Sequence, residues 1–297
     1  MRRFPGILLV FLVAGCGQEG NGPAKTIKKL DIKSVYQGPG PIRAVCTTGM
    51  VADLVRNVGQ GRVRVHQIMG PDVDPHLYKP TTVEINQLQT ADIIFYNGLH
   101  LEGKMGEVLE RLGRKQPAIG IGEYLDPALI LQEDKVYDPH IWFDVDLWRQ
   151  TAGLVGEALA RFDPPHAEEY RANAGKYQQQ LQDLDQWVSR QIKEIPPAQA
   201  VLITSHDAFR YLHQRYGLAV RGLQGISTEA EASLRDVEDL VHFIVDRKIK
   251  AVFVETSVNE KLIREIAKDA GVKVGGKLYS DSMGPPGSAG ESYIGMI

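Results

Sequence analysis

Residues 166–195 read HAEEYRANAGKYQQQLQDLDQWVSRQIKEI, and this stretch decides the expected fold. Proline pairs flank it, at 164–165 where a helix tolerates proline and at 196–197 where a helix ends. Inside it, one stripe recurs at intervals of three and four residues, and seven of its eight members are apolar or aromatic: Tyr170, Ala174, Tyr177, Leu181, Leu184, Val188, Gln191 and Ile195. The pattern predicts one helix over 164–196, roughly 45 Å long at about 1.5 Å per residue.

A helix of this length either covers the surface of one domain or connects two. The chain has 297 residues, which is enough for two domains. On both sides of the helix, strand-like runs alternate with amphipathic helical patterns, as is typical of parallel α/β sheets. The strand-like runs are 43–47, 63–68 and 92–96 before the helix, and 200–204 and 251–254 after it.

The two halves also begin alike, with a strand, a short loop and a helix (AVCTTGMVADLV and AVLITSHDAFRYL). The sequence therefore predicts an α/β fold with two similar parallel-sheet lobes joined by one long rigid helix. The expected ranges are 41–163 for the first lobe, 164–196 for the connecting helix and 197–297 for the second lobe.

The first residues are expected to direct the protein out of the cytoplasm. Arg2 and Arg3 precede a short apolar run that ends in Gly15-Cys16, which is typical of a secretory signal and too short for a membrane-spanning helix. The box LVAGC at 12–16 predicts a bacterial lipoprotein with a signal peptide at 1–15 and lipid on Cys16; the alternative is a plain signal peptide. Residues 16–40 are rich in Gly, Pro, Lys and Gln and predict a flexible tether, with order beginning near Ile42.

Composition and motifs exclude several classes of function. The net charge of −3 gives no reason to expect nucleic acid or an anionic membrane surface as a partner. With Cys16 lipidated, Cys46 is alone and no disulfide framework is possible. The chain contains no G-x-S-x-G, P-loop or H-E-x-x-H motif.

Four polar residues follow predicted strands or stiff turns. His76 and His140 each come directly after Asp-Pro, in DVDPHLYKP (72–80) and YDPHIWF (137–143); His206 follows the strand at 200–204, and Asp281 follows KLYS. Open α/β sheets bind ligands at the carboxyl ends of their strands. Three imidazoles and one carboxylate suit a divalent transition metal, although any one of these histidines alone is as easily a turn or core residue.

Three further residues are candidates for the surroundings of such a site. Glu231 and Glu255 are expected to cap helices or to orient a ligand histidine, and His100 also follows a predicted strand. A catalytic zinc keeps an open position, whereas four protein ligands fill a tetrahedral shell, so binding rather than catalysis is expected. The alternatives are a zinc-dependent hydrolase of the cell envelope, with Glu231 or Glu255 as base, and a surface adhesin with a structural metal.

Six segments, in order along residues 43–297, together resemble the TroA-like (cluster A) solute-binding proteins, the metal receptors of zinc and manganese ABC importers. They are GPDVDPHLYKPT, ADIIFYNGLHLEGKM, YDPHIWFDV, SHDAFRYL, GLQGISTEAEASLRD and YSDSMG. The resemblance implies two α/β lobes on one rigid helix and a metal held between them. It implies His76 and His140 as ligands from the first lobe, and His206 and Asp281 as ligands from the second.

The resemblance also implies a role and partners. The protein would be an extracytoplasmic, lipid-anchored monomer that delivers Zn²⁺ or Mn²⁺ to a permease and its ATPase. Manganese receptors often carry Glu at the third ligand position, where this chain has His206, and the three imidazoles favour zinc without excluding Mn²⁺ or Fe²⁺. Zinc-dedicated relatives often insert a histidine-rich loop, but residues 113–137 contain no histidine. Relatives usually continue with a closing helix where this sequence stops at Ile297, so either the sequence is truncated or the second lobe lacks its last helix.

Overall fold

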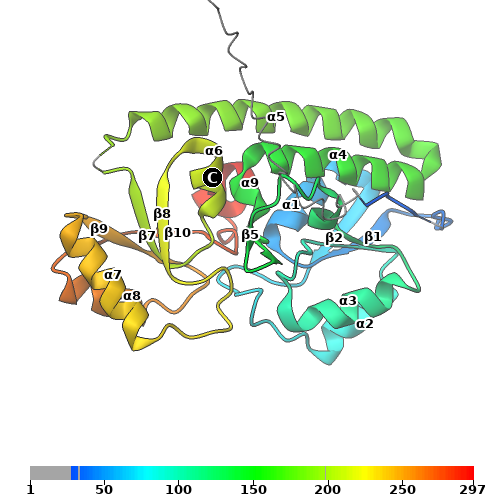
Figure 1. Ribbon diagram of the computed structural model, residues 1–297. Helices are drawn as coiled ribbons and strands as arrows, with labels where there is room; N and C mark the ends of the chain where they lie inside the picture. Colours follow the sequence, from blue (N-terminus) through cyan, green and yellow to red (C-terminus); the bar gives the residue numbers. More distant parts are fainter. Residues whose placement is uncertain (1–27, 33, 198) are drawn as a thin grey trace, which may run out of the picture.

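The computed structural model describes residues 28–32, 34–197 and 199–297, and it shows two α/β lobes beneath one long helix (Figure 1). The first lobe contains a four-stranded parallel sheet in the order β2-β1-β3-β4. Its strands are β1 (Ile42–Cys46), β2 (Val63–Gln67), β3 (Ile93–Tyr96) and β4 (Ala118–Gly120). Its helices before the connection are α1 (Gly49–Gly59), α2 (Thr82–Thr90), α3 (Gly106–Gly113) and α4 (Val145–Phe162). Strands β5 (Gln132–Glu133) and β6 (Val136–Tyr137) form a small antiparallel pair.

The second lobe contains two parallel strand pairs, β7 with β8 and β9 with β10, and β7 contacts β9. The strands are β7 (Val201–His206), β8 (Ala219–Gln224), β9 (Ala251–Glu255) and β10 (Lys273–Leu278), and the helices are α6 (Arg210–Tyr216), α7 (Leu234–Asp246) and α8 (Lys261–Asp269). The predicted fold class, two parallel α/β lobes joined by a long helix, is confirmed.

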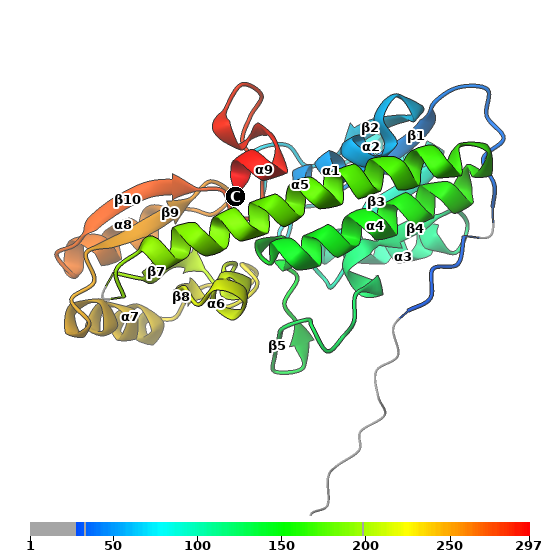
Figure 2. The ribbon, with the colours of Figure 1, turned by 90° about the horizontal axis from the view of Figure 1, so that it is seen from above.

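The connecting helix α5 spans Ala167–Glu194, after a 3₁₀ turn at Pro164–His166. Figure 2 shows it crossing both lobes beside α4 (Val145–Phe162). The predicted stripe is buried from Tyr170 to Val188, in the same core as α1 and α4, whereas Gln191 is exposed. Most of the helix is therefore packed into the first lobe, and the second lobe contacts it through α6.

The end of the chain packs back against the first lobe. Helix α9 (Tyr293–Met296) contacts α1, and the ring of Tyr293 stacks on Trp148 of α4 with centroids 5.4 Å apart. The Tyr293 hydroxyl donates to the carbonyl oxygen of Trp142 at 2.6 Å. Tyr293, which lies in the range predicted for the second lobe, thus takes part in the core of the first lobe.

Part of the expected tether is also packed. Leu30 is buried in the first lobe's core, and the Tyr36 N–H donates to the carbonyl oxygen of Phe162 at 2.6 Å. The prediction of a flexible tether to residue 40, with order beginning near Ile42, was therefore wrong for this part, because these apolar side chains anchor it. The signal peptide at 1–15 and Cys16 lie outside the described residues. Within the ranges described, no helix is long and apolar enough to cross a membrane.

Candidate metal centre

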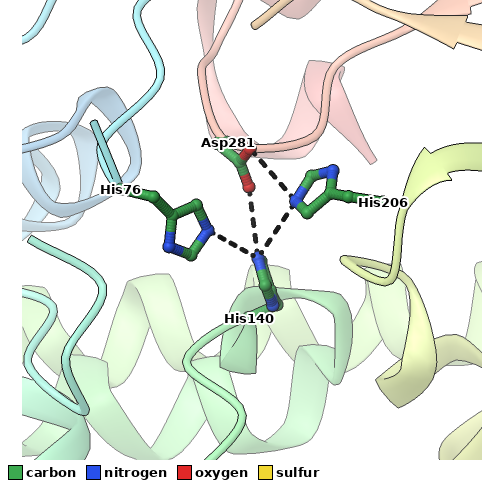
Figure 3. A group of neighbouring side chains, drawn as sticks. All are labelled: His76, His140, His206 and Asp281. Atoms are coloured by element: carbon green, nitrogen blue, oxygen red, sulfur yellow. Dashed lines mark hydrogen bonds and ion pairs between the residues drawn. The ribbon is translucent and has the colours of Figure 1, made fainter. Parts of the chain in front are cut away.

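Four side chains from the two lobes point toward one another in the cleft (Figure 3). His76 lies in the loop between β2 and α2, His140 precedes the 3₁₀ turn at Ile141–Phe143, His206 ends β7 and Asp281 follows β10. All four are buried, and one ligand atom from each lies within 4.8 Å of the others. The structure thus brings together all four residues predicted as ligands.

The ligand atoms of all four residues lie within 4.8 Å of one another, and four of the separations between them suit a tetrahedral metal ion. His140 Nε2 lies 3.3 Å from His76 Nε2 and 3.4 Å from His206 Nε2. Asp281 places one carboxylate oxygen 3.3 Å from His140 Nε2 and the other 3.3 Å from His206 Nε2. A tetrahedral zinc with bonds of about 2.0–2.1 Å separates its ligand atoms by about 3.3–3.4 Å. Asp281 Oδ1 is buried without a well-formed hydrogen bond, and a cation would satisfy it.

Two of the imidazoles are oriented by carboxylates behind them. His140 Nδ1 lies 2.7 Å from Asp138 Oδ1, and His206 Nδ1 lies 2.7 Å from Glu255 Oε2. Glu255 Oε1 also accepts the backbone N–H groups of Ser205 and His206 at 2.8 and 3.0 Å. A carboxylate on Nδ1 directs the Nε2 lone pair toward a metal. The structure therefore places Glu255 where the sequence predicted an orienting group, while Asp138 was missed.

The repeated Asp-Pro-His turn explains how Asp138 could have been found. In both copies the Asp carboxylate accepts the N–H of the histidine two residues later, at 2.9 Å for Asp74 and 3.1 Å for Asp138. This closed turn brings the carboxylate close to its histidine. Asp138 also contacts the His140 ring, whereas Asp74 uses its other oxygen to accept from the hydroxyl of Thr228, at 2.6 Å, in the second lobe.

Two of the predicted neighbours are not part of the cluster. Glu231 is exposed, and the prediction that it acts as a base or orients a ligand was wrong, because its loop directs Thr228 inward and Glu231 to solvent. His100 is exposed and has a left-handed backbone (φ 67°). It lines a cavity beside His76 without joining the four ligand atoms.

A buried glutamate in the loop after β3 was also missed. Glu102 accepts hydrogen bonds from the Thr47 hydroxyl at 2.8 Å and from the backbone N–H groups of Asn97 and Gly98 at 2.6 and 3.0 Å. Burial raises its pKa to about 7. These bonds hold the loop that brings Gly103 against the carbonyl oxygen of His76, where a Cβ atom would clash. No local sequence signal distinguishes this glutamate from a solvated one.

The electrostatics differ between the ligands. Burial lowers the pKa of His76 to about 3. Burial alone would also lower the pKa of His140 and His206, but Asp138 and Asp281 raise it for His140, and Asp281 and Glu255 raise it for His206. Burial alone would raise the pKa of Asp281, yet His206 and His140 hold it well below its usual range. Protons therefore compete with a metal less at His76 than at His140 and His206.

Two α/β lobes on one long helix, with imidazoles and a carboxylate converging between them, define the class of solute-binding proteins that enclose a metal ion. The family model for the periplasmic component A of the zinc-uptake complex (ZnuA) matches residues 44–297. The chain belongs to this family, which confirms the resemblance seen in the sequence.

Individual relatives agree with this assignment. The chain is 39% identical over 298 residues to the manganese-binding lipoprotein MntA of Bacillus subtilis (strain 168), covering 98% of this chain and 93% of the relative. It is 42% identical over 259 residues to the zinc-binding protein TroA of Treponema pallidum (strain Nichols), covering 85% and 84%. The solved structure of the periplasmic zinc-binding protein TroA from Treponema pallidum superposes with a TM-score of 0.84 at 41% identity, over 86% of this chain and 95% of that one.

Proposed function

We propose that this protein is the extracytoplasmic receptor of an ABC importer, which captures a divalent transition metal between its lobes and delivers it to a permease and its ATPase. The observation that carries the proposal is the buried cluster of His76, His140, His206 and Asp281, drawn from both lobes with ligand atoms within 4.8 Å of one another. In this proposal these four side chains are the ligands, and the metal is the cargo.

Zn²⁺ is the cargo that the donor set favours. Three imidazole nitrogens and one carboxylate in a compact tetrahedral arrangement suit zinc better than manganese, which prefers oxygen donors and more ligands. The two similar relatives are named for different metals, MntA for manganese and TroA for zinc. Mn²⁺ and Fe²⁺ are therefore expected to compete for the same site with lower affinity.

The number of ligands and the positions of Glu231 and Glu255 favour metal binding over catalysis. Four protein ligands fill a tetrahedral shell and leave no position for an activated water. Glu231, the first candidate base, is exposed, and Glu255 is engaged by two backbone N–H groups and the ring of His206. The structure therefore offers no support for the alternative of a zinc-dependent hydrolase.

The setting of the receptor is proposed from its first residues. The box at 12–16 predicts lipid on Cys16 after removal of residues 1–15, and a relative as similar as MntA is named a lipoprotein. The mature chain would thus stay attached to the outer face of the cytoplasmic membrane or lie in the periplasm. Because one chain supplies all four groups, a monomer suffices for capture.

Metal analysis of the purified protein after loading with Zn²⁺ and dialysis tests the proposal. We expect one zinc per chain, and none after the double substitution His76→Ala, His140→Ala. His242→Ala is the matched control, because His242 is exposed on α7 away from the cleft. Less than one zinc per loaded chain, or full retention by the double variant, would overturn the proposal.

A further inference from the structure

The four groups of the metal centre are all buried, but only one of them borders a cavity. A cavity of 540 Å³ between the lobes is lined by His76, with His100, Lys104 and Glu107 from the first lobe and Ser227 and Glu229 from the second. His140, His206 and Asp281 are not among its lining residues, and His76 itself is only 2% exposed, as is Asp281. An ion that passes through this cavity would therefore meet His76 first, once that side chain or its loop moves.

The second lobe holds the His76 loop at two points. The Thr228 hydroxyl donates to Asp74 Oδ2 at 2.6 Å, and the Asp72 N–H donates to the Ser282 hydroxyl at 3.1 Å. Asp74 in turn accepts the N–H of His76 through its other oxygen, at 2.9 Å. A chain of two hydrogen bonds therefore runs from the second lobe to the backbone of a ligand residue in the first.

Thr228 suits a positioning role because it acts on His76 only through Asp74. It lies in the loop after β8, 154 residues from Asp74 in sequence, and it is 7% exposed. A hydrogen bond from a hydroxyl to an ionised carboxylate in a partly buried position is among the stronger hydrogen bonds of a protein. Ser282 is less informative, since it adjoins Asp281 and its substitution would disturb a ligand directly.

We propose that Thr228 is a positioning residue that sets the rate of metal release, by holding the Asp74 turn, and through it His76, while the lobes are closed. Separation of the lobes breaks the Thr228–Asp74 hydrogen bond and loosens the one ligand that borders the cavity. During this step Asp138 stays beside the ring of His140 and Glu255 stays beside the ring of His206, because each of these pairs lies within one lobe. This inference rests on the proposed function, since it takes His76 as a ligand of the cargo.

The test is the dissociation rate of Zn²⁺ from loaded protein, measured by stopped flow against an excess of a chromogenic chelator. Thr228→Val removes the hydroxyl at nearly constant volume, and we expect dissociation about tenfold faster, the value of one hydrogen bond to a charged group. The association rate should change little, because Thr228 touches none of the four ligand side chains. Thr228→Ser keeps the hydroxyl and should restore slow release, which a purely steric role would not predict.

Two further variants keep the test decisive. Thr228→Val replaces the hydroxyl with a methyl group, whereas Thr228→Ala removes the hydroxyl and puts nothing in its place. Both variants should release zinc equally fast, so a folding defect caused only by the valine would be recognised. Thr90→Val is the matched control: Thr90 is exposed, bonds only to carbonyl oxygens of its own helix α2, and should leave release unchanged.

The failures are distinguishable. An unsubstituted protein that retains no zinc would overturn the proposed function and this inference with it. Stoichiometric zinc with equal dissociation rates for Thr228→Val and the unsubstituted protein would overturn this inference alone, and so would fast release by Thr228→Ser.

Discussion

The two Asp-Pro-His turns have the same sequence and the same local hydrogen bond, yet they hold their histidines differently. Asp138 is fully buried and keeps both the backbone and the ring of His140 in place from within the first lobe. Asp74 accepts a hydrogen bond from the backbone N–H of His76 through one oxygen. Its second oxygen accepts a hydrogen bond from the hydroxyl of Thr228 in the other lobe. The repeated motif builds the same turn twice, and the tertiary surroundings decide what each copy does.

The surroundings of His140 and His76 also differ, since one histidine has buried contacts behind it and the other borders a cavity. Behind His140, the indole N–H of Trp142 donates to the carbonyl oxygen of Ser280 at 3.0 Å, in a buried contact that joins the loops of His140 and Asp281. Beside His76 lies the cavity. His140 is thus held by buried contacts within the first lobe and across to the Asp281 loop, whereas His76 borders the cavity and is held through Asp74 by Thr228 of the second lobe.

The largest expected effect separates the two histidines. His140→Ala removes a ligand together with the ring that Asp138 orients, so zinc affinity should fall by more than the roughly 10–100-fold that loss of an orienting carboxylate alone costs. His76→Ala removes a ligand that has no carboxylate behind its ring, so the loss should be smaller. Competitive titration with a fluorescent zinc chelator measures both, and an equal loss would contradict the distinction.

The pH dependence of affinity should come from one half of the centre. The neighbouring carboxylates raise the pKa of His140 and of His206, so protons compete with zinc more strongly at these two rings than at His76. Affinity should therefore fall as the pH is lowered from 7.5 to 5.5. The pKa of His76, lowered to about 3, leaves that ring neutral throughout this window. His76→Ala should therefore bind more weakly with an unchanged pH slope in the same titration; a flatter slope would place the displaced protons on His76.

A smaller effect is expected from the carboxylate behind His140. Asp138→Asn keeps the turn but weakens the orientation of the ring, and changes of this kind cost about 10–100-fold in metal affinity. Asp74→Asn should affect equilibrium affinity less, since no ring nitrogen of His76 depends on it. Isothermal titration with Zn²⁺ compares the two, and the reverse order would show that Asp74 is the more important support.

The smallest effect is expected for the contact between the two buried loops. Trp142→Phe keeps an aromatic ring but loses the hydrogen bond to Ser280, worth about 1 kcal/mol or roughly fivefold in affinity. Dissociation rates, measured against chelator, should remain slow compared with those of Thr228→Val. Faster zinc release from Trp142→Phe than from Thr228→Val would mean that the His140 side, and not the His76 side, controls release.

Periodicity and local motifs predicted much of this molecule. The spacing of Tyr170 to Val188 predicted the connecting helix over 164–196, and the structure has it as a 3₁₀ turn followed by Ala167–Glu194. The grouping of His76, His140, His206 and Asp281 came mainly from the family resemblance, because ligands this far apart share no local motif.

The remaining features depend on contacts between distant segments. Thr228 meets Asp74, and Tyr293 meets Trp142, through pairings of side chains separated by 154 and 151 residues, for which one sequence carries no periodic signal. Glu231 and Thr228 belong to the same short polar run, and only the backbone path decides which of them faces inward. Leu30 appeared to belong to a polar tether, although a single apolar residue can anchor such a segment once a core offers a site.

A crystal structure of the zinc-loaded protein, with anomalous diffraction recorded on both sides of the zinc edge, tests the central claim most directly. The account predicts one strong zinc peak in the cleft, with bonds of about 2.0–2.2 Å to the three histidine Nε2 atoms and to Asp281. A zinc peak elsewhere, or a zinc in the cleft that has a water in place of one of these four ligands, would contradict it.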